Sequence, residues 1–174
     1  TGNTRRFGAS FEKIKQVADV RKGEIMFGLN MIVHKGKTIF VADTSVHEYP
    51  TSEEMSEIAM SAARVVRLFG FDPKVAFVSH STFGQPVTSR TKHIRKAVDI
   101  LREKNVDFEF DGDMQPDVAL NKEYKNLYPF SKIVGNANIL IMPGQHSAAI
   151  SYKMMKTLGD TKVIGPLLIG LGLP

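Results

Sequence analysis

The sequence predicts an α/β fold of three layers, in which a mostly parallel sheet carries helices on both faces. Short apolar runs of strand length alternate along the chain with segments of helical periodicity, the pattern of a sheet covered on both sides. One early pair of apolar runs is joined by a short turn, which adds a β-hairpin. A hydrophobic content of 43% in 174 residues is enough to fill the core of such a fold.

The first half of the chain contains the hairpin and the clearest helix. Apolar residues at helical spacing predict a helix over 7–20, and two strands are expected within 24–43, joined where Gly36 permits a tight turn. A helix is predicted over 50–70, because Thr51 and Glu54 have the spacing of a capping box.

The second half alternates regularly between strands and helices. Strands are expected at 74–79, 106–110, 138–143 and 162–170, and helices at 90–105, 116–127 and 146–159. No internal repeat or linker interrupts this order. The chain opens without methionine and closes on an apolar segment, so we expect residues 1–174 to be a fragment of a longer polypeptide.

Composition excludes several classes of protein. The chain has no cysteine, which rules out disulfides and thiolate chemistry and fits a cytoplasmic location. No apolar run has membrane-spanning length. The net charge of +5 is spread along the chain without a nucleic-acid-binding signature, so a solvated basic surface or an anionic ligand explains it better.

Ligands of such sheets bind beyond the carboxyl ends of the strands. Segments rich in small, polar or turn-forming residues occupy those positions, and we expect them to converge on one rim: 42–50, 79–90, 111–117, 142–149 and 164–172.

The segment 79–90 is the strongest anion candidate. Its serines and threonines offer donors, and Arg90 lies near the start of the following helix, whose free N–H groups favour phosphate. An equally good interpretation is that Ser and Thr only cap that helix. Residues 1–6 have a similar composition, with a frayed end as the alternative.

The segment 111–117, DGDMQPD, leaves three interpretations open. Asp111 and Asp113 could hold Mg²⁺, or act as acid and base, or belong to an acidic turn that leads through Pro116 into a helix. His47 and His146 could be acid/base groups, although isolated histidines are more often structural. No zinc-protease or serine-hydrolase motif is present.

The chain resembles the phosphotransacetylase domain along nearly its whole length. The resemblance is carried by VADTSVHEYPTSEEMSEIA, DGDMQPDVALN, YPFSKIVGNANILIMPGQHSAAISYKMM and VIGPLLIGLGLP. The variants HEYP, STFGQP and HSAAIS are most similar to the version fused to the C-terminus of large bacterial NADP-dependent malic enzymes.

The resemblance implies the later part of a two-lobed α/β domain, related in shape to isocitrate and isopropylmalate dehydrogenases. Members move acetyl between coenzyme A and phosphate without a metal or bound organic cofactor, and they form dimers or larger homo-oligomers. In the malic-enzyme fusions the domain is expected to bind acetyl-CoA and to regulate the enzyme. NADP and a divalent metal would then belong only to an upstream domain that converts malate to pyruvate.

The resemblance also implies residues that face a CoA or phosphate cleft. The motif TGNTRR suggests Thr1, Thr4 and Arg5, and STFG suggests Ser81 and Thr82. The motif DGDMQ suggests two further residues, Asp111 and Gln115.

Three departures from the family pattern limit the expected activity. Asp113 replaces the commoner Glu, GQHSAAIS differs from the stretch of true transferases, and the chain stops before the Ser-Arg pair that true transferases carry. We therefore expect this segment to be inactive alone. Three functions remain open: a regulatory acetyl-CoA-binding domain, a true phosphate acetyltransferase, and a silent oligomerisation domain.

Overall fold

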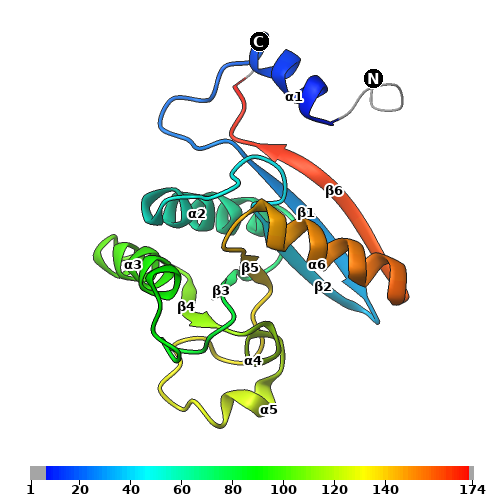
Figure 1. Cartoon of the computed structure of the whole chain (residues 1–174). Helices are drawn as coiled ribbons and strands as arrows, with labels where there is room; N and C mark the ends of the chain where they lie inside the picture. Colours follow the sequence, from blue (N-terminus) through cyan, green and yellow to red (C-terminus); the bar gives the residue numbers. More distant parts are fainter. Residues whose placement is uncertain (1–6, 173–174) are drawn as a thin grey trace.

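A six-stranded sheet forms the centre of the molecule, whose computed structural model describes residues 7–172 (Figure 1). The strands lie in the order β4-β3-β5-β2-β1-β6. Their bounds are β1 Phe27–His34, β2 Lys37–Ala42, β3 Lys74–Val78, β4 Glu109–Met114, β5 Ile139–Ile141 and β6 Thr161–Ile169. The helices are α1 Phe7–Lys15, α2 Ser52–Leu68, α3 Ser89–Glu103, α4 Pro116–Leu120, α5 Lys122–Lys125 and α6 Gln145–Leu158.

The sheet is mixed, with a parallel part and an antiparallel part. Strands β4, β3, β5 and β2 run parallel to one another, whereas β1 pairs antiparallel with both β2 and β6. The carboxyl ends of β2, β3, β4 and β5 therefore lie at one edge of the sheet. Both the predicted α/β fold and the predicted hairpin of β1 and β2 are confirmed.

Apolar side chains fill the space on both faces of the sheet. On one face, α2 and α3 pack through residues such as Ile58 and Leu101 against Phe27, Phe40 and Phe77. On the other face, the smaller helices α4 and α6 cover a second core. Strands β1, β3 and β5 are buried on both sides, which explains why their sequences are apolar along most of their length, whereas β6 is partly exposed.

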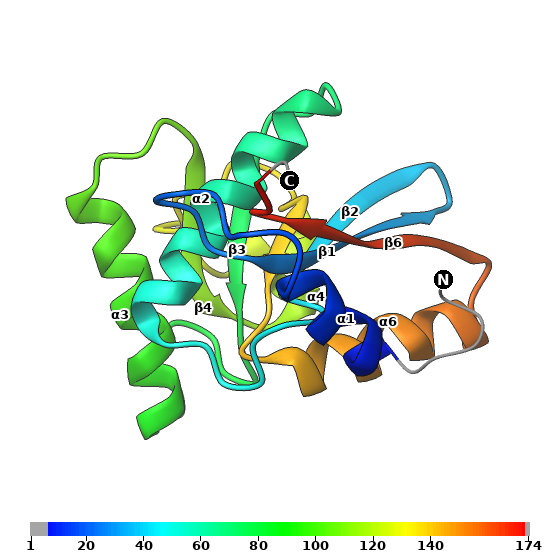
Figure 2. The same ribbon diagram turned by 90° about the horizontal axis from the view of Figure 1, so that it is seen from above.

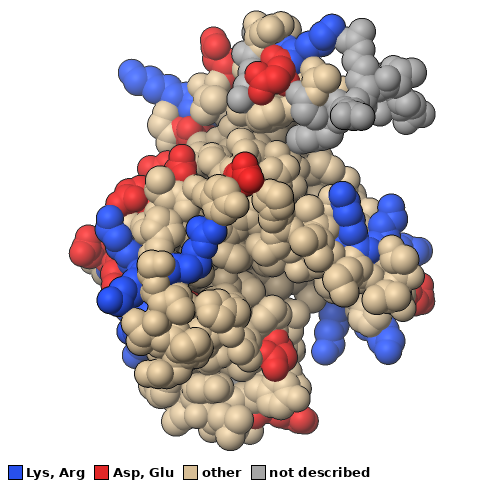
Figure 3. All heavy atoms as spheres, viewed as in Figure 1, with Lys and Arg blue, Asp and Glu red and all other residues tan. Residues whose placement is uncertain are grey.

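Helices α2 and α3 lie side by side, and the hairpin and β6 extend away from them (Figures 1 and 2). Basic and acidic side chains are interleaved on the side of α2 and α3, and a separate basic group surrounds the end of α6 (Figure 3). The positive charge on this face is thus divided among several places. None of the helices within residues 7–172 has the length and apolarity that a membrane crossing requires.

The start of α2 agrees with the capping box expected from its sequence. The Thr51 side chain accepts a hydrogen bond from the backbone N–H of Glu54, whose carboxylate accepts one from the N–H of Thr51. A second capping box starts α3, in agreement with the interpretation that Ser and Thr of segment 79–90 cap this helix: Thr88 and Thr91 exchange the same two bonds.

Strand β4 corrects two expectations. It begins at Glu109, later than predicted, and runs to Met114, so the turn expected at Asp111-Gly112 is wrong. Asp111 and Gly112 instead pair with Ala76 and Phe77 of β3. Acidic residues were read as turn formers, but here their carboxylates are buried and hydrogen-bonded by other segments, which removes the cost of burial.

The single helix expected over 116–127 is also wrong. Asn121 ends α4 in an extended conformation, and its side chain accepts a hydrogen bond from the N–H of Glu123 and so starts α5. An asparagine that can bond to its own backbone competes with a continuous helix. Pro116 does occupy the first turn of α4, as predicted.

Candidate functional site: a cavity at the rim of the sheet

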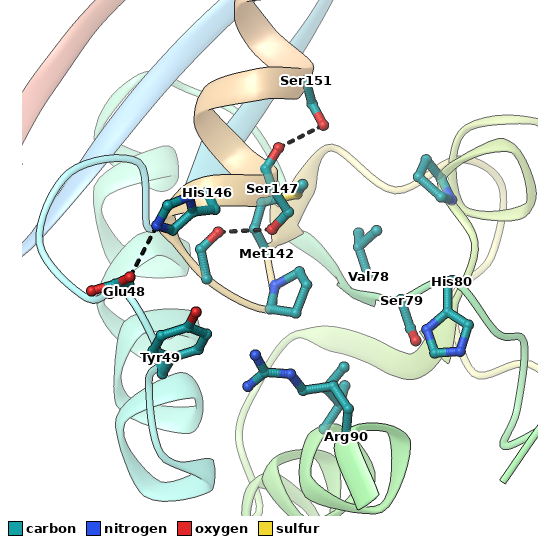
Figure 4. A pocket seen from close by; sticks show the side chains of 14 residues that line it. Glu48, Tyr49, Val78, Ser79, His80, Arg90, Met142, His146, Ser147 and Ser151 are labelled. Atoms are coloured by element: carbon teal, nitrogen blue, oxygen red, sulfur yellow. Dashed lines mark hydrogen bonds and ion pairs between the residues drawn. The ribbon is translucent and has the colours of Figure 1, made fainter. Parts of the chain in front are cut away.

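A cavity of about 420 Å³ opens at the carboxyl edge of the parallel strands, and we call it the rim cavity (Figure 4). Four of the five expected segments form its walls: Glu48 and Tyr49 follow β2, Ser79 and His80 follow β3, Pro116 follows β4, and 142–144 follow β5. The segment 164–172 does not line it, because most of that segment lies within β6. The volume is within the usual range for small-molecule sites.

The cationic wall of the rim cavity is formed by Arg90 at the start of α3. Its guanidinium lies 5.1 Å from the centre of the Tyr49 ring, so the ring helps to orient the charge without neutralising it (Figure 4). Tyr49 and Arg90 also line a neighbouring cavity of about 340 Å³. A ligand longer than the rim cavity could therefore continue past this pair.

Two helices begin at the rim cavity and add partial positive charge. Arg90 lies in the first turn of α3, and His146 and Ser147 lie in the first turn of α6. N–H groups at a helix start and the helix dipole both favour an anion. Together with Arg90 they make this wall suitable for a phosphate group.

Much of the remaining lining is apolar or already hydrogen-bonded. Val78, Ile94 and Met142 supply apolar surface. The hydroxyl of Ser147 donates to the carbonyl of Gly144, and His146 Nε2 lies 3.0 Å from Glu48 Oε1 (Figure 4). Within residues 7–172, no hydrogen bond joins a serine hydroxyl of this cavity to a histidine. The geometry thus favours binding over nucleophilic catalysis of the serine–histidine type.

The loop after β2 is held in position by the carboxylate of Asp43, which is 1% exposed. This carboxylate accepts hydrogen bonds from four backbone N–H groups, those of Gly28, Ser45, Val46 and His47. His47 Nδ1 lies 2.7 Å from Asp43 Oδ2, so His47 has a structural partner and does not line the rim cavity. Asp43 therefore fixes the path that brings Glu48 and Tyr49 to the site.

The loop after β3 is joined to β4 by buried polar contacts. Ser81 donates a hydrogen bond to Asp113 Oδ2, and its hydroxyl lies 3.3 Å from that of Ser79, which lines the cavity. Thr82 is also buried, and its hydroxyl accepts from the N–H of Gln115. Ser81 and Thr82 thus support the wall from behind and do not line it themselves.

The other predicted site residues divide between two places. The amide of Gln115 donates to the carbonyl of His80 at 2.8 Å and so supports the rim cavity. Asp111 instead lines a different cavity beside β4. Thr1, Thr4 and Arg5 lie outside the described residues.

Tyr49 and Gly144 are site residues that the sequence reasoning did not name. A Cβ at Gly144 would collide with the carbonyl oxygen of Glu48, so only glycine lets the start of α6 approach this loop. The sequence does place this tyrosine and this glycine in segments that follow two parallel strands. It gives no indication that the two segments contact each other.

The carboxylates of Asp111 and Asp113 have different hydrogen-bond partners. Asp111 Oδ2 accepts from the N–H of Lys132, while Asp113 bonds to Ser81 and has one oxygen, Oδ1, without a partner. Over the described part of the chain, no three His, Cys, Asp or Glu side chains are grouped in a way that could hold a metal ion.

Comparison with known proteins gives the family. The model of the phosphate acetyl/butaryl transferase family matches residues 1–174. The chain belongs to this family. Its domain is 46% identical over 171 residues to the NADP-dependent malic enzyme of Rhizobium meliloti, a match that covers 98% of this chain but only 22% of that protein.

Other members resemble the domain at lower identity. The phosphate acetyltransferase of Bacillus subtilis is 32% identical over 163 residues, which is 92% of this chain and 49% of that protein. A phosphotransacetylase structure from Streptococcus pyogenes superposes with a TM-score of 0.90 at 29% identity, covering 98% of this chain and 53% of the other. The predicted resemblance and fold are confirmed, and the transferase-family domain spans only part of each relative's length.

Proposed function

We propose that this transferase-family domain binds acetyl-CoA in the rim cavity and regulates an NADP-dependent malic enzyme of which it is part. The full protein would oxidise malate with NADP and release pyruvate and carbon dioxide. Its NADP and divalent metal would be held by an upstream domain. The observation that carries the proposal is Arg90, an exposed cation at a helix start inside a cavity with apolar walls.

The lining of the rim cavity suits the parts of acetyl-CoA. Phosphate groups need cations and free N–H groups, which Arg90 and the starts of α3 and α6 offer. The acetyl and pantetheine parts need apolar surface, which Val78, Ile94 and Met142 offer. The adjoining cavity beside Tyr49 gives such a long ligand room to extend.

The test is a titration of acetyl-CoA against the full-length protein while malate oxidation is followed by NADPH formation. Acetyl-CoA is expected to change the rate, and Arg90→Gln to raise the concentration for half the effect by about tenfold, the worth of one charge-assisted hydrogen bond. The matched control is Lys92→Gln, an exposed cation on the same helix that lines none of the cavities described above. An unchanged rate at every physiological acetyl-CoA concentration would remove the proposal.

A second candidate function is acetyl transfer between CoA and phosphate. Membership in the transferase family favours it. Direct assay of acetyl phosphate formation from acetyl-CoA with the full-length protein tests it, and no acetyl phosphate formation would remove this candidate.

A further inference from the structure

A second cavity, of about 400 Å³, lies beside β4, the strand at the end of the sheet next to α3 (Figure 1). We call it the edge cavity. It shares no residue with the rim cavity and draws its walls from α3, β4 and the segments around Phe83 and Phe130. The two cavities are therefore lined by different side chains.

Three cations converge on the edge cavity. Arg95 and Arg102 are seven residues apart on α3, and Lys132 comes from the segment between α5 and β5. Residues seven apart complete about two helical turns, so both arginines lie on the same face. This cluster joins parts of the chain that are distant in sequence.

Two of these cations are unpaired. Arg102 Nη1 lies 2.7 Å from Asp99, and Nη2 lies 3.5 Å from Asp111. By contrast, the Arg95 guanidinium and the Lys132 ammonium make no hydrogen bond or ion pair with any residue between 7 and 172. Asp111 forms no ion pair with either of them: its oxygens accept the backbone N–H groups of Gly112 and Lys132, and Oδ1 lies 3.5 Å from Arg102 Nη2.

The guanidinium of Arg95 lies beside the loop after β3. Gly84 has a φ of +81°, and a Cβ there would collide with Arg95 Nη1. The absence of a side chain at Gly84 therefore leaves the space that the guanidinium occupies. One of the two unpaired charges thus lies close to the backbone of Gly84 with its hydrogen-bonding capacity unused.

An aromatic surface completes the site. The Phe130 ring is packed edge-on against Phe83 at 4.7 Å between centroids, yet Phe130 remains 59% exposed. A ring that is supported on one side and open on the other can stack against a planar group. Cations beside an open aromatic ring are the combination that a phosphate joined to a nucleobase requires.

We propose that the edge cavity binds a nucleoside phosphate. Arg95 and Lys132 hold the phosphate, Arg102 supports it, and the base stacks on Phe130. The carboxylate of Asp111 keeps the backbone of β4 and of Lys132 in position and does not touch the phosphate.

The experiment is a calorimetric titration of AMP into the full-length protein. Wild-type protein is expected to bind AMP more tightly than inorganic phosphate. Arg95→Gln and Lys132→Gln are each expected to weaken AMP binding by about tenfold or more, because each removes a charge-assisted hydrogen bond. Both side chains are exposed, so the substitutions leave the core intact. Phe130→Ala should weaken AMP binding and leave phosphate binding unchanged.

Two controls separate this proposal from the acetyl-CoA site. Lys92→Gln removes an exposed cation from the same helix, and Arg90→Gln alters the rim cavity, so neither should change the affinity for AMP. The proposal is overturned by any of three results: no AMP binding at millimolar concentration, equal affinity for AMP and phosphate, or an affinity unaffected by Arg95→Gln and Lys132→Gln. Loss of AMP binding in Arg90→Gln alone would assign the nucleotide to the rim cavity and also overturn it.

Discussion

Individual polar residues inside this domain act mainly by fixing loops. The carboxylate of Asp43 accepts hydrogen bonds from four backbone N–H groups and contacts the ring of His47. The carboxylate of Asp113 accepts a hydrogen bond from Ser81. Both carboxylates are buried, and each accepts hydrogen bonds from its surroundings.

The sequence revealed acidic residues near strand ends but not their partners, because burial of a charge depends on which distant groups surround it. This is why Asp111 was expected in a turn and is found in a strand.

The replacement Asp43→Asn should lower the free energy of unfolding by about 2–3 kcal/mol, because an amide NH₂ would then face backbone N–H groups that need an acceptor. Urea denaturation of wild type and variant measures the difference. Asp72→Asn, at an exposed carboxylate without such bonds, is the control and should change stability by less than about 0.5 kcal/mol. A loss at Asp43 no larger than at Asp72 would contradict the role assigned to this carboxylate.

The rim cavity is formed mainly by residues at the ends of helices and strands. The starts of α3 and α6 and the ends of β2, β3 and β5 supply most of the rim cavity. The sequence predicted this convergence, because apolar runs alternating with helices imply parallel strands whose carboxyl ends meet. It misplaced β4, where the carboxylates of Asp111 and Asp113 have partners far along the chain. It also merged α4 with α5, because it overlooked the local bond between Asn121 and the N–H of Glu123.

The capping box of α2 gives a prediction at this scale. Thr51→Ala removes the acceptor for the N–H of Glu54 and should lower the free energy of unfolding by about 1 kcal/mol. Thermal or urea unfolding measures it. Thr157→Ala, near the exposed end of α6, is the control and should be nearly neutral. Equal effects of the two substitutions would argue against a capping role for Thr51.

At the scale of the whole molecule, α6 has an apolar surface that the described residues leave uncovered. Ile150, Met154 and Leu158 recur at every fourth position and are 59%, 55% and 81% exposed. Residues with this spacing form one stripe on a helix. We expect a second copy of the domain to pack on this stripe, because the family resemblance implied a homo-oligomer.

Replacing Met154 with Asp should prevent the expected association, because packing against a second copy would bury an unpaired carboxylate. Light scattering coupled to gel filtration of the full-length protein gives the mass. Lys153→Asp, which introduces the same side chain at the neighbouring position, is the control. An oligomer that survives Met154→Asp, or a wild type that is monomeric, would rule out α6 as the interface.

The central claim is that acetyl-CoA binds in the rim cavity with Arg90 as its main cation. Calorimetric titration of acetyl-CoA into the full-length protein and its Arg90→Gln variant tests this most directly. We expect saturable binding by the wild type and an affinity about tenfold lower in the variant. Equal affinities in the two proteins, or no binding to the wild type, would contradict the account.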